Sequence, residues 1–192
     1  TKIWDTPDPY LSATSPSTML RAFADEIKNN YQGRLAHLMS TRPIPGGVAW
    51  INVLCSNYNS GSSSGPYAVS GHMYSSLGAF PAYSWNVEVV AHELGHNFGS
   101  YHTHDCAWNG NNTQIDDCGS EAGYGGGSCY DPNNPILPAA NQGTIMSYCH
   151  LGGNSGIGFN QGFGQQPGDL IRNRFNSASC ATGCSGGVTC SD

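Results

Sequence analysis

Residues 92–102 read HELGHNFGSYH, and the spacing of the histidines and glycine in this segment restricts how the chain can fold. His92 and His96 are four residues apart, so they lie one turn apart on the same side of a helix. Gly99 is typical of a helix C-terminus, because glycine adopts the left-handed backbone conformation at little cost. A bend there can return His102 to the first two histidines. The segment therefore predicts a helix, a sharp turn and three clustered imidazoles.

Three histidines in this arrangement indicate a catalytic metal site. Structural zinc sites usually have four protein ligands, whereas three ligands leave a coordination position open for water or substrate. Glu93 lies on the flank of the histidine face, where its carboxylate can hold a water bound to the metal. We therefore expect His92, His96 and His102 to bind one Zn²⁺ ion and Glu93 to be catalytic. The alternative is a set of ordinary histidines with a solvated glutamate.

The first half of the chain predicts helices and strands in alternation. Residues 1–4 are a short strand candidate. Ser15 and Pro16 are typical of a helix start, with serine as the N-cap and proline in the first turn. Apolar residues then follow at helical spacing, namely Met19, Leu20, Phe23 and Ile27. Further strand candidates are residues 35–40, 48–55 and 67–76. The second of these is apolar almost throughout, as in a strand covered on both faces, and the third is expected at an edge.

A second helix is expected over residues 85–99, and it carries the first two histidines. Its apolar residues form one stripe, which consists of Val87, Val90, Ala91, Leu94 and Phe98. We expect this stripe to pack on the sheet while the histidines face a cleft. Beyond Gly99, glycine, asparagine, serine and cysteine dominate, and only a short helix at 168–176 is expected.

These elements predict one domain over residues 1–192, because this length suits a single buried core. The expected fold class is α/β (α+β). A twisted mixed sheet with a backing helix and the histidine helix would occupy residues 1–99. An irregular, loop-rich subdomain tied by disulfides would occupy residues 100–192.

The cysteines indicate an oxidising compartment. There are eight, scattered singly through glycine-rich segments, and no two of them form a C-x-x-C pair. An even number without metal-binding spacing favours up to four disulfides and therefore a secreted, extracellular protein. Buried free thiols are the alternative interpretation.

Charge and hydropathy exclude two classes of partner. Lysine and arginine total seven and do not cluster, and the net charge of the chain is −6. A surface that binds nucleic acid is therefore not expected. No apolar run is long enough to span a bilayer. The expected partner is a protein or peptide substrate.

The HExxHxxGxxH pattern of residues 92–102 resembles the extended zinc signature of the metzincin endopeptidases. That resemblance implies a methionine turn under the zinc, and GTIMSY at 143–148 fits it with Met146. It also implies a role for Tyr148, at the position where astacins and serralysins have a tyrosine that ligates zinc and swings away to hydrogen-bond the reaction intermediate. Without the resemblance, Met146 and Tyr148 would be interpreted as packing residues.

Within the metzincins, the chain is similar to the adamalysin (reprolysin) branch, most of all its secreted bacterial relatives. This resemblance spans roughly residues 1–180 and rests on AHELGHNFGSYH and on the stretch from IWDTPDPY through LAHLMSTRPIPGG to Cys55. Adamalysins usually have aspartate directly after the third histidine, where this chain has Thr103, with Asp105 two residues later. They also begin with a strand and helix ahead of IW. Either the chain is a fragment, or a propeptide or N-terminal segment that acts as a partner was lost in maturation, or the sheet is smaller.

The resemblance also implies a disulfide between Cys55 and Cys180. Proximity in the sequence suggests Cys118–Cys129 and Cys184–Cys190, which would leave Cys106–Cys149. These three pairs are guesses, because spacing does not determine connectivity.

Two further groups of side chains are weaker candidates. Four carboxylates in the loop-rich half could hold Ca²⁺, although a solvated loop is favoured: Asp116, Asp117, Glu121 and Asp131. His104 and His150 flank the metal site but do not fit the ligand spacing, so we expect them to be solvated or to support the ligands.

The combined prediction is a secreted zinc-dependent endopeptidase. Zinc lowers the pKa of a bound water from about 15.7 toward about 7, and Glu93 would accept its proton and pass it to the departing amine. Tyr148 would help to stabilise the oxyanion. Two alternatives are kept: a non-catalytic adhesion or binding module on the same fold, and a zinc hydrolase of non-peptide amides.

Overall fold

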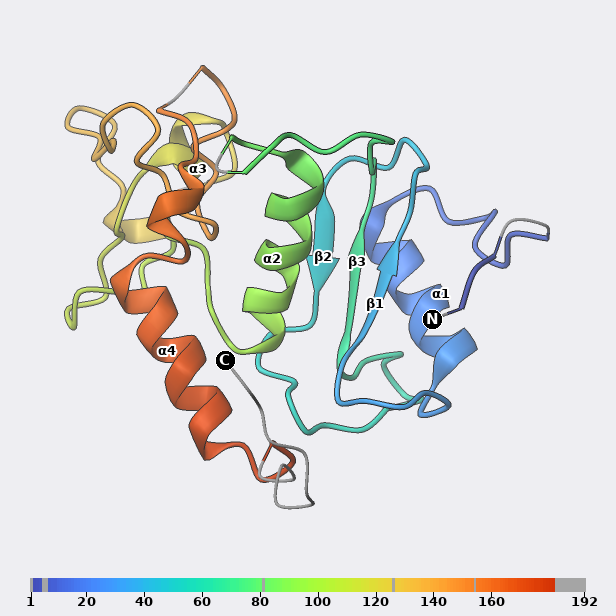
Figure 1. Cartoon of the computed structure of the whole chain (residues 1–192). Coiled ribbons are helices and arrows are strands. Elements are labelled where there is room, and N and C mark those ends of the chain that lie inside the picture. The colour runs from blue at the N-terminus through green and yellow to red at the C-terminus, as the bar shows by residue number, and fades with distance from the viewer. Residues whose placement is uncertain (1, 5–6, 81, 126, 154, 182–192) are drawn as a thin grey trace.

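Two helices cover opposite faces of a small sheet, and a loop-rich half follows (Figure 1). The computed structural model describes residues 2–4, 7–80, 82–125, 127–153 and 155–181. Its α-helices are α1 (Pro16–Ile27), α2 (Trp85–Asn97), α3 (Cys118–Glu121) and α4 (Gln165–Ser177). Its strands are β1 (Ala36–Met39), β2 (Gly47–Ala49) and β3 (Tyr67–Ser70). This mixed α/β architecture confirms the predicted fold class.

Helix α1 begins where the sequence predicts. The Ser15 side chain accepts a hydrogen bond from the Thr18 backbone N–H, and the Thr18 side chain accepts one from Ser15 N–H. This reciprocal capping satisfies two backbone donors at the helix start. The buried face of α1 packs against β3 in the main core, and consists of Met19, Leu20, Phe23 and Ala24. Helix α1 is therefore the predicted backing helix.

The sheet has the order β1-β3-β2, with β3 parallel to β1 and antiparallel to β2. The expectation of an edge strand at 67–76 was wrong, because β3 is the central strand and all four of its residues are buried. Val69 pairs with Leu38 on one side and Val48 on the other. The covering of both faces by α1 and α2 explains why even Ser70 is fully buried.

The segment expected as a strand over residues 48–55 is extended only as far as β2. Beyond it, Asn52 and Val53 donate backbone hydrogen bonds of 2.9 Å to His96 O and Asn97 O. These carbonyls belong to the last turn of α2, and His96 O also accepts the Gly99 N–H at 2.8 Å. The chain therefore leaves the sheet because its N–H groups satisfy the end of a helix instead of a neighbouring strand.

The expectation of a strand at residues 1–4 was also wrong for the part that the structure describes. Lys2, Ile3 and Trp4 form no strand. The Trp4 ring packs edge-on against Tyr10 at a centroid distance of 5.4 Å, beside the main core. An aromatic contact, rather than strand pairing, holds this segment.

Helix α2 is oriented differently from the prediction. The apolar stripe is not the most buried side of the helix: Val87 is 44% exposed and the other four residues are only half-buried. The sheet side of the helix includes Glu93 and Asn97, and the Asn97 amide donates to Trp50 O at 2.9 Å and Tyr67 O at 3.1 Å. Because α2 is enclosed by the sheet and the loop-rich half, its two polar sides are the buried ones.

Disulfides hold the loop-rich half together. The Cys55–Cys180 pair is confirmed. The other guesses were wrong, since Cys106 pairs with Cys129 and Cys118 with Cys149. Cys118 and Cys149 are fully buried in a small apolar cluster with Ile157 and Phe159, and this packing brings α3 to the segment after Met146. The suggested Cys184–Cys190 pair lies outside the described residues.

A helix with the length and apolar composition of a bilayer span is not found among the described residues.

Candidate metal centre and cleft

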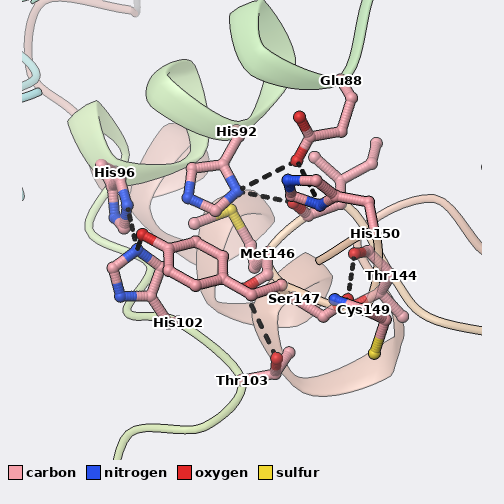
Figure 2. A network of polar contacts seen from close by, with 12 residues as sticks. Glu88, His92, His96, His102, Thr103, Thr144, Met146, Ser147, Cys149 and His150 are labelled. Atoms are coloured by element: carbon pink, nitrogen blue, oxygen red, sulfur yellow. Dashed lines mark hydrogen bonds and ion pairs between the residues drawn. The ribbon is translucent and has the colours of Figure 1, made fainter. Parts of the chain in front are cut away.

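Helix α2 and the turn after it bring His92, His96 and His102 together (Figure 2). The first two lie one turn apart on α2, and Gly99 adopts a φ of +98° where the chain turns back. The Nε2 atoms of His96 and His102 are 3.1 Å apart, and one ligand nitrogen from each of the three rings lies within 4.8 Å of the others. These residues could hold one metal ion, as the spacing predicts.

The outer nitrogens of these rings face fixed partners. His92 Nδ1 lies 2.7 Å from Ile145 O, and His96 Nδ1 lies 2.7 Å from Ser100 O. His102 Nδ1 is 3.5 Å from a carboxylate oxygen of Asp105, which also accepts the His102 backbone N–H at 2.9 Å. Such partners orient a metal-binding ring and direct its other nitrogen toward the metal.

The departure from the adamalysin pattern at Thr103 now has a physical account. Asp105 supplies a carboxylate beside the third histidine from two residues further along the chain. Thr103 itself is fully buried, and its backbone N–H donates to Met146 O at 3.1 Å. The threonine therefore connects the histidine loop to the segment that contains Met146.

Burial favours the neutral form of the two histidines on α2. It lowers the pKa of His92 well below 6.5, and burial together with the neighbouring His102 lowers the pKa of His96 to about 4. Neutral imidazole is the form that binds a metal ion. His92 and His96 are therefore in the form that binds a metal at neutral pH.

Glu93 lies between the histidine cluster and the sheet. It is buried, its Oε2 has no hydrogen-bond partner within the protein, and burial together with nearby Glu88 raises its pKa well above the usual value. Gly47 on β2 makes room for it, since a Cβ there would lie 2.5 Å from Glu93 Oε1. A buried carboxylate oxygen without a partner is costly unless a ligand or water completes the site. Together with the three imidazoles, this donor set fits a zinc ion with an open position.

Met146 lies beneath the histidine helix (Figure 2). It is fully buried, and a Cβ on Gly95 of α2 would lie 2.5 Å from its sulfur. The chain turns at this point, because Ser147 N–H donates to Thr144 O at 3.0 Å. The methionine thus supports the helix turn between His92 and His96.

Tyr148 brings a hydroxyl into the cluster, with its oxygen 3.1 Å from His102 Nε2. Burial, reinforced by the Glu93 charge, raises the pKa of Tyr148 above its usual value. The phenol is therefore protonated at neutral pH and can donate a hydrogen bond.

The two other histidines near the site are not solvated. His104 is 4% exposed and stacks on His102 at a centroid distance of 4.9 Å. His150 lies beside Tyr83, Trp85 and Tyr148. Both rings support the walls of the site rather than extending into water.

A cavity of about 670 Å³ opens beside the histidines and includes His92, Glu93 and Tyr148 in its lining. Its lining also includes Glu88, which is 2% exposed and which sequence reasoning missed. Burial raises the pKa of Glu88 to about 8. A usable signal was present in the sequence, because residue 88 is four positions before His92 and so lies on the same helix face.

The calcium candidates do not form a common site in the described part of the chain. Asp116 accepts the Cys118 N–H at 3.0 Å and Asp117 accepts the Ile136 N–H at 2.7 Å, so both buried carboxylates hold local backbone. Glu121 and Asp131 are exposed. Calcium binding therefore stays a prediction that this geometry does not favour.

Three clustered imidazoles beside a buried glutamate in a cleft are an arrangement typical of metal-dependent hydrolases. The sequence matches a reprolysin family, described as metallo-peptidase family M12, over residues 1–155. The chain therefore belongs to the M12 metallopeptidases, a family of zinc-using enzymes. A comparison with curated proteins finds no match.

Proposed function

We propose that this M12 metallopeptidase is a secreted endopeptidase that hydrolyses internal peptide bonds of proteins. The observation that carries the proposal is the convergence of three ligand nitrogens next to the unpartnered Oε2 of Glu93. His92 and Glu93 line a cavity large enough for a substrate segment. An open cleft of this kind can admit the middle of a substrate polypeptide, whose ends lie away from the site.

His92, His96 and His102 would hold the zinc ion, and the lowered pKa values of His92 and His96 favour binding. A bound zinc ion supplies Lewis-acid chemistry, since it lowers the pKa of a water molecule to about 7 and polarises a carbonyl oxygen. Asp105 orients His102 through its Nδ1. The backbone carbonyls of Ile145 and Ser100 do the same for the other two rings.

Glu93 acts as the general base and then the general acid. Its free Oε2 accepts a proton as the oxygen of water attacks the peptide carbonyl carbon. The raised pKa lets the carboxyl group carry this proton, which it then donates to the amine nitrogen as the C–N bond breaks. Tyr148, protonated and close to His102, donates a hydrogen bond to the oxygen that gains negative charge.

Secretion is supported by the cysteines. Three disulfides lie within the described residues, and they tie together the half of the chain that has little regular structure. Such bonds persist in oxidising compartments and are rare in the cytosol.

The test is a comparison of the wild type with Glu93→Gln on a denatured protein substrate. The variant should keep its zinc, because Glu93 is not a ligand, and should lose activity by 10²–10⁴-fold, the usual contribution of a general base. Zinc is measured by atomic absorption and cleavage by gel and mass spectrometry. Glu26→Gln, an exposed carboxylate on α1, is the control.

A chelator should abolish wild-type cleavage, and added zinc should restore it. Wild-type protein that holds zinc but cleaves no protein substrate would contradict the proposal and favour a binding module or a hydrolase of other amides. Full activity in Glu93→Gln would contradict the role of the carboxylate.

A further inference from the structure

The cavity beside the histidines combines aromatic walls with a buried carboxylate. Tyr83 and Trp85 lie against the ring of His150, at centroid distances of 6.0 Å and 5.8 Å. All three residues line the cavity, as does Glu88. Aromatic faces and a carboxylate are the two features that attract organic cations in proteins.

Glu88 has no cationic partner among the residues that line this cavity. Its Oε1 lies 3.6 Å from His92 Nδ1 and 4.0 Å from His150 Nδ1, beyond hydrogen-bond distance (Figure 2). His92 Nδ1 already lies 2.7 Å from Ile145 O. The lining contains no lysine or arginine.

A purely structural role does not explain why the Glu88 carboxylate is buried at this location. It occupies the first turn of α2, on the same face as His92 and directly beside the metal cluster. Burying a carboxyl group away from any cation costs free energy in either protonation state, and an apolar residue would fill the same space without that cost. A group that arrives with the substrate would supply the missing charge.

We propose that this cavity binds the side chain of an arginine or lysine next to the scissile bond, with Glu88 as the residue that determines specificity. The inference rests on the proposed endopeptidase function and names its substrate class. A guanidinium would donate hydrogen bonds to the Glu88 carboxylate, while Tyr83, Trp85 and the ring of His150 would contact its flat face and its aliphatic stem.

The first experiment uses the zinc-loaded wild-type protein. Cleavage sites in a peptide library are mapped by mass spectrometry, and matched peptides are then made that differ only at the selected flanking position. They carry arginine, lysine, norleucine or citrulline, and citrulline has the shape of arginine without its charge. We expect kcat/KM for arginine to exceed that for citrulline by about tenfold to a hundredfold. Equal rates would overturn the inference and leave the proposed function intact.

The second experiment introduces Glu88→Gln, which keeps the shape of the side chain and removes its charge. The ratio of kcat/KM for the arginine peptide to that for the citrulline peptide should fall to within about threefold. Glu26→Gln serves as the control and should keep the full preference. If Glu88 only orients His92, the variant would instead lose zinc or lower kcat equally for all peptides, and the specificity role would be wrong.

A binding measurement separates the two proposals. The Glu93→Gln variant is titrated with the arginine and citrulline peptides, and the fluorescence of Trp85 in the cavity wall reports occupancy. The arginine peptide should bind more tightly than the citrulline peptide, and this difference should disappear when Glu88→Gln is added to Glu93→Gln. That result supports the inference even if the wild type cleaves nothing. Equal binding of both peptides overturns it.

Discussion

At the scale of single residues, the site depends on the absence of side chains as much as on their presence. Gly47 leaves room for the Glu93 carboxylate, where a Cβ would lie 2.5 Å from Oε1 and 2.7 Å from Cγ. A real Cβ does not approach other atoms so closely, so one of the two groups would have to move. Because Gly47 lies within β2, we expect the Glu93 side chain to move.

Gly47→Ala should therefore displace the carboxylate of Glu93, the proposed general base, while leaving the proposed metal ligands in place. A displacement of about 1 Å can reduce the rate about a hundredfold, so we expect a loss of that order in kcat/KM with normal zinc content. Gly61→Ala is the control, since its Cβ would meet only the flexible side chain of Asn59, at 3.3 Å. Undiminished activity in Gly47→Ala would show that the carboxylate tolerates the shift.

At the scale of elements, α2 is positioned by contacts on its polar sides. Asn97 bonds to the sheet, Glu93 lies under β2, and Gly95 packs directly on Met146. The side of α2 that is richest in apolar residues is the more exposed one. A helix that carries the chemistry of a site is thus held by hydrogen bonds and close backbone approach, in addition to apolar burial.

Gly95→Ala tests this close approach. Alanine favours a helix by about 1 kcal/mol over glycine, but its Cβ would lie 2.5 Å from the Met146 sulfur. Overpacking of this kind usually costs about 1–3 kcal/mol, so we expect a net loss in the free energy of unfolding, measured in urea. Gly168→Ala in α4, whose Cβ would meet only the Arg172 guanidinium at 3.3 Å, should be neutral or stabilising.

A double-mutant cycle tests whether the alanine at position 95 and Met146 compete for the same space. Met146→Ala should cost less stability in the Gly95→Ala background than in the wild type, because the smaller residue relieves the contact. Additive effects would mean that the two residues do not compete for space.

At the scale of the whole molecule, disulfides connect parts that the sheet does not reach. Cys55–Cys180 joins the segment after β2 to the chain beyond α4 across 125 residues, whereas Cys118–Cys149 joins α3 to the segment three residues after Met146. Only the second bond adjoins the proposed metal centre. The two bonds should therefore contribute differently to stability and to zinc binding.

Replacing either pair by alanine should lower the free energy of unfolding by about 2–5 kcal/mol. Loss of Cys118–Cys149 should also weaken zinc binding by about tenfold or more, because the support for the ligands is loosened. Loss of Cys55–Cys180 should leave zinc affinity within about twofold. Denaturant unfolding and zinc competition with a chromogenic chelator measure the two quantities. Equal zinc affinity in both variants would contradict the proposed support.

Much of the site could be predicted because it depends on neighbours along the chain. The histidine spacing follows from the helical repeat, the return of His102 follows from the conformation available to Gly99, and the Ser15 cap acts on Thr18 within one turn. These are interactions of residues a few positions apart, which the sequence by itself determines.

The rest was decided by contacts between distant residues. The strand at Tyr67–Ser70 became central because β1 and β2 pair with both of its edges, and residues 52–54 left the sheet because their N–H groups bond to carbonyls at the end of α2. Cysteine partners were likewise set by which segments pack together. The cavity that holds Glu88 exists only once α2 meets the loop after Met146. Local conformational preferences do not determine these features, because each one depends on which surfaces are buried against each other in the folded chain.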